Sequence, residues 1–277
     1  MARLFATDLD GTLVDRDGRI LPRDAAAIRR AMAEGVTVTI ATGRLTTGTL
    51  PIAHELRLDA PLVCADGAVL VRRTQTAPLR RTGVGRDHVD HLLDKLTDSG
   101  AARFVFTHDA IHACERSAPH HGYVRGWSPA LTSHDDVRRA PAWRADQDAA
   151  VMVVGIGPEE AIRDIEAHVL ASSELDALTF SIDFGRFHVV RVIRKGVSKG
   201  SALTALADEL GIALSDVAVV GDWHNDTPMF EIAGRSFAMP HAPPALRAVA
   251  TDVLGDEATT EGGIALALER WLGITLP

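Results

Sequence analysis

The sequence predicts an α/β protein with a doubly wound, Rossmann-like parallel-sheet core and an inserted α+β domain. Strands and helices alternate in the first part of the chain and again after Arg194, which is typical of a parallel sheet covered by helices. Antiparallel hairpins are expected in the stretch between these two parts. At 277 residues the chain also lies near the size at which a single core divides into two domains.

The N-terminal part is expected to alternate strands and helices as far as residue 78. Apolar residues 4–7 suit a buried strand, and Pro22 and Gly35 bracket a helix, because proline favours the first turn and glycine follows the last. The elements expected next are a strand at 36–41, a helix at 46–57, a strand at 61–65, a turn at 66–67 and a strand at 68–71. The polar, proline-containing stretch 74–81 is expected to lead out of this unit.

Residues 79–193 are expected to form a separate domain inserted into the first, which would then comprise residues 1–78 and 194–277. The expected elements of the insertion are a helix at 87–98, a hairpin of 103–107 and 110–113, a strand at 149–156, a helix at 158–170 and a hairpin of 177–183 and 187–193. Residues 117–147 are rich in His, Pro, Arg and Asp without periodicity, so a long loop or irregular helix is expected there.

The parallel pattern resumes after Arg194. Ser198 suits the N-cap of a helix that ends before Gly211, which puts Lys199 in its first turn. The helix dipole disfavours a cation there, so Lys199 is either solvated or held to meet an anion. The elements expected after it are a strand at 216–220, a helix opened by Pro228, strands at 236–239 and 252–254 and a helix at 263–272.

The composition describes an ordinary globular protein with 46% hydrophobic and 24% charged residues, and no apolar run is long enough to span a bilayer. A formal net charge of −8 argues against a nucleic-acid partner. The N-terminus lacks a signal-peptide pattern, and Cys64 and Cys114 are too few for a disulfide framework. A cytoplasmic protein without a membrane partner is expected, as a monomer or small homo-oligomer.

Two carboxylates, Asp8 and Asp10, directly follow the first apolar strand, and Gly11 and Thr12 come next. Burying a lone carboxylate is costly, so two at the end of a strand require a cation, hydrogen bonds or solvent. A divalent metal ion meets this requirement. For this fragment alone, a turn of the Asp-X-Asp-Gly type after an edge strand is an equal alternative.

Polar residues follow other core strands in the same way: residues 42–44 follow the strand at 36–41, and residues 221–226 follow the strand at 216–220. The carboxyl ends of parallel strands share one edge of the sheet, where ligands bind. The residues expected to converge there are Asp8, Asp10, Thr42, Lys199, Asp222, Asn225 and Asp226. Carboxylates, a hydroxyl and an ammonium suit Mg²⁺ and the phosphate that it neutralises. No Walker A loop or dinucleotide glycine fingerprint is visible.

These segments resemble, in order, the four motifs of haloacid dehalogenase superfamily phosphatases. The segments are Asp8-Leu9-Asp10-Gly11-Thr12, Thr42-Gly43-Arg44, Lys199 and Gly221-Asp222-x-x-Asn225-Asp226. The insertion and the following Gly196-Val197-Ser198-Lys199-Gly200 resemble the Cof-type branch with a large α/β cap, subclass IIB. The resemblance implies a Mg²⁺-dependent phosphatase of small phosphorylated metabolites, chiefly sugar phosphates, with flavin or pyridoxal phosphates as alternatives.

The resemblance also implies the chemistry of the acidic residues. Asp8 would be the nucleophile that forms an aspartyl-phosphate, and Asp10 would protonate the leaving oxygen and then activate water. Mg²⁺ would be held by the Asp8 carboxylate, the Asp10 backbone carbonyl and Asp222. Asp226 would either bind the metal directly or orient its waters.

The resemblance implies substrate contacts as well. The residues implied to bind the phosphate are Thr42, Gly43, Lys199 and Asn225, of which Asn225 would also steady Lys199 or the nucleophile. The residues expected to line the substrate are Arg44, Asp66 and His224. Asp66 stands where the branch commonly has asparagine, so it is a substrate contact or simply a turn aspartate. Trp223 and His224 are bulkier than the residues expected there, and they line the pocket mouth or serve packing.

Two other functions stay open at this point. A phosphosugar mutase would share the motifs but return the phosphoryl group to a sugar bisphosphate and not to water. A non-catalytic phosphometabolite-binding protein would need neither a nucleophile nor an acid, so the intact pair of Asp8 and Asp10 argues against it. The histidines and Cys114 of residues 108–121 match no standard zinc spacing and are expected to lie on a solvated surface.

Overall fold

The computed structural model describes residues 2–75, 77–144 and 146–274, and the chain divides into two compact units. The first unit comprises residues 1–42, 50–77 and 198–277, and the second comprises 43–49 and 78–197. Residues 43–49, expected in the core domain, group with the second unit because their polar groups bond to it. Leu45 N donates to Trp127 O over 2.9 Å, and Thr46 Oγ1 donates to His108 O over 2.8 Å. Thr76, in the stretch expected to leave the core, lies outside the described residues.

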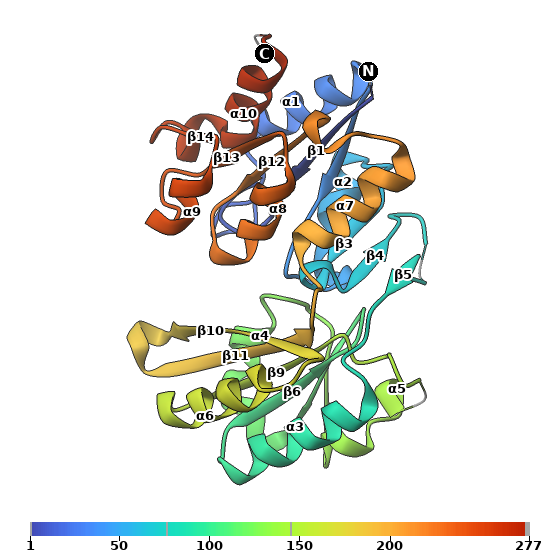
Figure 1. Ribbon diagram of the computed structural model, residues 1–277, viewed down its shortest axis with the longest axis vertical. Helices are drawn as coiled ribbons and strands as arrows, with labels where there is room; N and C mark the ends of the chain where they lie inside the picture. Colours follow the sequence, from blue (N-terminus) through green and yellow to red (C-terminus); the bar gives the residue numbers. More distant parts are fainter. Residues whose placement is uncertain (1, 76, 145, 275–277) are drawn as a thin grey trace. The chain divides into compact units, whose positions relative to one another are not determined.

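A parallel sheet with the strand order β14-β13-β12-β1-β2 forms the centre of the first unit (Figure 1). Its strands are β1 (Arg3–Thr7), β2 (Val36–Ile40), β12 (Val217–Gly221), β13 (Arg235–Ala238) and β14 (Asp252–Val253). Each neighbouring pair is parallel. β1 lies inside the sheet and is apolar on both faces, as a strand covered on both sides must be. The expected doubly wound parallel core is confirmed.

Helices cover both faces of this sheet, and successive residues of β1 contact helices on opposite faces. The helices are α1 (Pro22–Ala33), α2 (Thr46–Leu56), α7 (Lys199–Leu210), α8 (Thr227–Ile232), α9 (Pro244–Val249) and α10 (Gly263–Leu272). Leu4 and Ala6 pack in one cluster with residues of α7, α8 and α9. Phe5 points to the opposite face, where its ring lies 6.1 Å from that of Trp271. α10 and α1 lie side by side (Figure 1).

A short antiparallel ladder lies next to β2. β3 (Leu62–Cys64) pairs with β4 (Val69–Val71), and Val63 forms a parallel bridge with Ala41, the residue after β2. The 3-10 turn Ala65–Gly67 connects the two strands, and Ala65 and Asp66 there have φ of +50° and +53°. The expected turn is present, but two non-glycine residues adopt the left-handed conformation in it.

The second unit contains a sheet with the order β10-β11-β9-β6-β7-β8. Its strands are β6 (Ala102–Phe106), β7 (Ile111–Cys114), β8 (Leu131–His134), β9 (Met152–Gly157), β10 (Leu175–Ile182) and β11 (Phe187–Arg194), preceded by the short β5 (Arg80–Arg81). Its pairs are antiparallel except β7–β8, which is parallel. The expectation of a long loop or irregular helix over 117–147 was wrong in part, because the strand β8 forms there beside the short helices α4 (His121–Val124) and α5 (Pro141–Arg144). β8 has the sequence LTSH, whose single apolar residue gives no alternation to detect.

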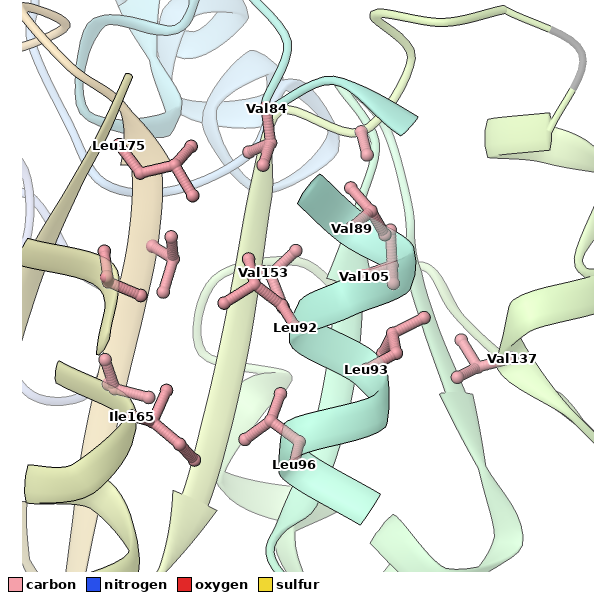
Figure 2. Close-up of a cluster of buried hydrophobic side chains, with 14 of the residues drawn as sticks. Val84, Val89, Leu92, Leu93, Leu96, Val105, Val137, Val153, Ile165 and Leu175 are labelled. Carbon is pink, nitrogen blue, oxygen red and sulfur yellow. The ribbon is translucent and has the colours of Figure 1, made fainter. Parts of the chain in front are cut away.

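Two helices, α3 (Arg86–Asp98) and α6 (Glu159–Leu170), pack on one face of this sheet. Figure 2 shows Leu92 and Leu96 of α3 near Val153 of β9, and the spacing places them one helical turn apart on one face. Trp143 of α5 is also buried in this cluster, and its Nε1 donates to Val137 O over 2.9 Å. The segment without periodicity therefore contributes to the core. Among the described residues, no helix has the length and hydropathy needed to cross a membrane.

Candidate active site

Lys199 lies at the centre of a buried cluster at the carboxyl end of β1. Its Nζ donates to Asp8 Oδ1 and to Asp226 Oδ1, each over 2.6 Å. The lysine is 1% exposed and Asp226 is fully buried. A charged group without solvent requires charged partners, and Lys199 has two carboxylates. Of the two alternatives left open for Lys199, solvation is therefore wrong. We call Asp8, Asp222, Asp226 and Lys199 the carboxylate cluster.

The start of α7 places Lys199 in this cluster. Ser198 caps the helix through a reciprocal pair of hydrogen bonds with Ser201, each 3.0 Å long. Gly67, with φ of +102°, lies so close that a Cβ there would come within 2.1 Å of Ser198 O. Gly200 approaches α8 equally closely, since its Cβ would lie 2.1 Å from Pro228 O. The lysine is therefore positioned by close backbone contacts that only glycine permits.

Asp226 also shapes the loop that carries Asp222. Its Oδ2 accepts hydrogen bonds from the backbone N–H groups of Asp222 and Trp223, both over 2.9 Å. A Cβ on Gly221 would lie 2.5 Å from the same oxygen, so the loop requires glycine at that position. One carboxylate thus uses one oxygen for Lys199 and the other for the backbone after β12.

Asp222 is held from two sides. Thr12 Oγ1 donates to its Oδ1 over 3.0 Å, and His241 Nε2 lies 3.3 Å from its Oδ2. Asp8, Asp222 and Asp226 each offer an oxygen within 4.8 Å of the others, a set that suits a hard divalent cation. Sequence reasoning missed His241. Its position shortly after β13 was the available signal, because that strand also ends at this edge of the sheet.

Burial and charge shift the pKa values within the cluster. Burial raises the pKa of Asp8 well above its usual value, with Lys199 opposing and the charges of Asp226 and Asp222 adding to the effect. Burial likewise raises the pKa of Asp226, again with Lys199 opposing. Burial alone would lower the pKa of Lys199, but the two carboxylates raise it. One ammonium does not neutralise three carboxylates, so a divalent cation would relieve their repulsion.

Asp66 connects two of the motifs through hydrogen bonds. Asn225 Nδ2 donates to Asp66 Oδ1 over 2.8 Å, and Asp66 N donates to Thr42 O over 3.0 Å. Thr42 N in turn donates to Val63 O over 2.9 Å. The Asn225 side chain is therefore bonded to Asp66. The left-handed backbone of Asp66 keeps its carboxylate in this position.

The remaining expected site residues lie in different surroundings. Asp10 follows β1 and is solvent-exposed. His224 is also exposed, and its ring packs edge-on against Trp223 with centroids 5.2 Å apart. Gly43 and Arg44 belong to the second unit, where Arg44 Nη1 donates to Gly48 O over 3.2 Å. The first unit alone thus brings together Asp8, Thr42, Asp66, Lys199, Asp222, Asn225 and Asp226.

A parallel sheet with this carboxylate cluster at the carboxyl ends of its strands is typical of a hydrolase of the haloacid dehalogenase type. The chain belongs to the haloacid dehalogenase-like hydrolases, whose family model matches residues 5–268. The family that the four motifs indicated is thereby confirmed.

Several named relatives of similar length are phosphatases, in agreement with the expected enzyme class. The HMP-PP phosphatase of Serratia proteamaculans (strain 568) is 27% identical over 278 residues, covering 98% of this chain and 96% of the relative. The 5-amino-6-(5-phospho-D-ribitylamino)uracil phosphatase YwtE of Bacillus subtilis (strain 168) is 29% identical over 295 residues, covering 98% of each. A crystal structure of a haloacid dehalogenase-like hydrolase from Bacteroides thetaiotaomicron has the same fold, with a TM-score of 0.82, 20% identity and coverage of 98% and 99%.

Proposed function

We propose that this protein is a Mg²⁺-dependent phosphatase that hydrolyses small phosphorylated metabolites through an aspartyl-phosphate on Asp8. The observation that carries the proposal is the buried bridge from Lys199 to Asp8 and Asp226, with Asp222 beside it. A binding protein could hold a phosphate with cations alone, whereas this site buries a carboxylate against the ammonium. That arrangement suits a nucleophile that must approach an anionic phosphate.

We assign the metal site to the carboxylates of Asp8, Asp222 and Asp226 together with the backbone carbonyl of Asp10. The three carboxylates offer only oxygen ligands, which Mg²⁺ prefers. When bound, the ion would supply positive charge that favours the ionised form of Asp8 and offsets the charge of the phosphate. Asp226 already accepts three hydrogen bonds, so it has fewer lone pairs to offer than Asp222.

The proposed reaction has two steps. An Asp8 oxygen forms a bond to phosphorus, and the bond from phosphorus to the leaving oxygen breaks as Asp10 donates a proton to that oxygen. Asp10 then accepts a proton from water, which attacks phosphorus and releases inorganic phosphate and the Asp8 carboxylate. The exposed position of Asp10 suits this exchange with water. The residues proposed to hold the phosphate oxygens are Thr42, Gly43, Lys199 and Asn225.

Sugar phosphates are the proposed substrate class, and the second unit is proposed to select among them as a cap. The residues proposed to line the substrate are Arg44, Asp66 and His224. The substrate named for the Bacillus subtilis relative combines a phosphorylated ribityl chain with a uracil ring. A substrate panel should therefore contain hexose and pentose phosphates together with phosphates of nitrogen heterocycles.

The direct test measures phosphate released from this panel with Mg²⁺ by the wild type and by Asp8→Asn. The variant is nearly isosteric but cannot attack phosphorus, so we expect turnover to fall by about 10³-fold or more without loss of fold. Asp17→Asn, which changes an exposed aspartate of the segment between β1 and α1, is the matched control and should retain activity. Folded Asp8→Asn with activity near that of the wild type would overturn the nucleophile assignment.

A labelling experiment separates a hydrolase from a mutase. Reaction of a hexose monophosphate in ¹⁸O-water should place the label in the released phosphate, because water is the proposed acceptor. Asp10→Ala should slow that release. Positional isomers of the sugar phosphate with little free phosphate, dependent on a bisphosphate activator, would instead assign the protein to the mutases.

A further inference from the structure

We propose that His91 and His168 form a binding site for a divalent transition-metal ion on the second unit, independent of the proposed phosphatase reaction. The two Nε2 atoms lie 2.9 Å apart and the ring centroids 4.8 Å apart. His91 comes from the middle of α3 and His168 from the last turn of α6. Both side chains are exposed, so an ion can reach them from solvent.

The distance between the two Nε2 atoms suits two ligands that bind the same metal ion. Imidazole nitrogens bind Zn²⁺, Ni²⁺ or Cu²⁺ at about 2.0–2.1 Å, and two nitrogens at the observed distance subtend about 90° at such an ion. This is the angle between neighbouring ligands in square-planar and octahedral complexes, which Cu²⁺ and Ni²⁺ favour. Without a metal, the same contact requires one ring to donate its N–H to the other.

The surroundings leave space for further ligands. His91 and His168 line a pocket of about 290 Å³ together with His88 and the apolar side chains of Leu92 and Leu175. His88 lies three residues before His91 on α3, so both project from the same side of the helix. His88 Nε2 is 3.6 Å from Glu174 Oε2. The pair thus supplies two nitrogens, and water or His88 can complete the coordination.

Some charged groups near the pair favour the binding of a cation and others oppose it. Burial, with Lys95 and His91 adding to it, lowers the pKa of His168. Lys95 also repels a cation. Glu174 attracts one, although Arg194 Nη2 is 2.7 Å from the same carboxylate. The two Nε2 atoms already meet, and a preformed pair gains roughly 10²-fold in affinity over single imidazoles.

The ligand chemistry separates this pair from other candidate sites. The carboxylate cluster offers only oxygens, which suit Mg²⁺. His112 and His134 also meet, with 3.1 Å between Nδ1 and Nε2, but His112 is only 4% exposed, so the expectation that it lies on a solvated surface was wrong. An ion would have to enter the packed sheet to reach that nitrogen. Of these sites, His91 and His168 combine imidazole ligands with access from solvent.

The test titrates the untagged protein with Cu²⁺ in saturating Mg²⁺, which on the proposed function occupies the carboxylate cluster. Calorimetry gives the affinity, and the electron paramagnetic resonance spectrum of bound Cu²⁺ reports nitrogen ligands. We expect one equivalent to bind with a nitrogen signature, and His91→Gln and His168→Gln each to weaken that binding by about tenfold or more. His54→Gln, which alters an exposed histidine of the first unit, should change nothing.

Three outcomes would overturn the proposal: no Cu²⁺ binding by the wild type, equal loss in His54→Gln, or loss in His134→Gln in place of the two named variants. Bound Cu²⁺ should also raise the melting temperature of the wild type and not of His91→Gln, because the ion links α3 to α6. None of these measurements depends on phosphate release, so failure here leaves the proposed function untouched.

Discussion

Asp24 is a buried carboxyl whose role depends on a helix far along the chain. It lies on α1 and is 1% exposed, and its Oδ1 accepts a hydrogen bond from Ala265 N in the first turn of α10 over 2.8 Å. Gly262 permits this contact, because a Cβ there would lie 2.6 Å from the same oxygen. Asp24 thus caps α10 from another helix, at the cost of burying a carboxylate.

We expect this cost to appear as a pH dependence of stability. Burial raises the pKa of Asp24 from 3.8 to about 6, with the backbone N–H groups of Ala265 and Ile264 opposing. The folded state therefore binds the proton more tightly than the unfolded state. This proton contributes on the order of 3 kcal/mol to the free energy of unfolding. The contribution is fully present below about pH 4 and is lost as the pH rises through about 6.

The measurement compares urea denaturation of wild type and Asp24→Asn from pH 4 to pH 8. The amide oxygen can still accept from Ala265 N but carries no charge, so the variant should gain stability relative to the wild type between about pH 4 and pH 6 and hold the gain above that. If the difference in the free energy of unfolding between the variant and the wild type does not change with pH, burial of the ionised Asp24 carboxyl does not destabilise the fold.

The carboxylates of the proposed metal site predict a strict choice of ion. Mg²⁺ requires six ligands at about 2.0–2.1 Å, whereas Ca²⁺ takes six to eight at about 2.3–2.6 Å. A larger, looser ion would misplace Asp8, so activity lost on chelation should return with Mg²⁺ and only weakly with Ca²⁺. Phosphate release by chelator-treated protein with each ion tests this. Equal rates with both ions would contradict it.

At the scale of elements, the start of α7 joins local capping to long-range packing. Ser198 and Gly211 mark the ends of this helix in the sequence, and both act as expected, with Gly211 at φ of +66°. The sequence did not indicate that the turn Ala65–Gly67 lies against the first turn of the helix. That contact, together with the ion pairs of Lys199, offsets the unfavourable position of a cation in the first turn.

Two glycine substitutions distinguish the cost of a steric collision from the cost of a side chain at positive φ. Gly67→Ala and Gly196→Ala both put a Cβ on a residue with positive φ, of +102° and +80°. Only at Gly67 does the Cβ collide, with Ser198 O, while nothing lies within 4 Å at Gly196. We expect Gly196→Ala to cost about 1 kcal/mol and Gly67→Ala at least about 3 kcal/mol, by denaturation. Gly67→Ala should also lower turnover, since Lys199 follows Ser198. Equal effects would refute the packing argument.

At the scale of the whole molecule, the sheet of the second unit carries buried and half-buried aromatic side chains on a face distinct from the one that α3 and α6 cover. Phe104 and Phe106 alternate with Val105 along β6 and so point away from that helix-covered core. The Trp127 ring lies 5.6 Å from that of Phe106, and the His121 ring lies 6.2 Å from that of Phe104. The His120 ring packs edge-on against that of Phe187, with centroids 4.8 Å apart.

We expect this face to choose the substrate while the first unit performs the chemistry. His120→Gln, His121→Gln and Trp127→Phe should change the ratio of kcat/KM between two metabolite phosphates by about tenfold. Activity on a small generic ester such as p-nitrophenyl phosphate should change much less. Asp164→Asn, at an exposed position of α6, is the control. If the variants lose the same fraction of activity on every substrate, the second unit serves general closure and does not select the substrate.

The sequence by itself determined the parallel core and the family, because both depend on local signals. Apolar strands, helix caps at Ser198 and Gly211, and polar residues at strand ends are all visible in short stretches, and parallel topology then brings the strand ends to one edge. The same reasoning placed Asp8 and Asp222 together before any contact was known. It failed at β8, where a polar strand is stabilised by its neighbour β7 and not by its own pattern.

Only the tertiary structure decided which groups pair within the site. The partners of Lys199, the contact of His241 with Asp222 and the bond from Asn225 to Asp66 join residues between 19 and 191 positions apart. Such pairs depend on how α7, β12 and the turn Ala65–Gly67 pack, and no spacing in the sequence encodes that distance. The contact between His91 Nε2 and His168 Nε2 has the same origin, since two helices must dock before their side chains can meet.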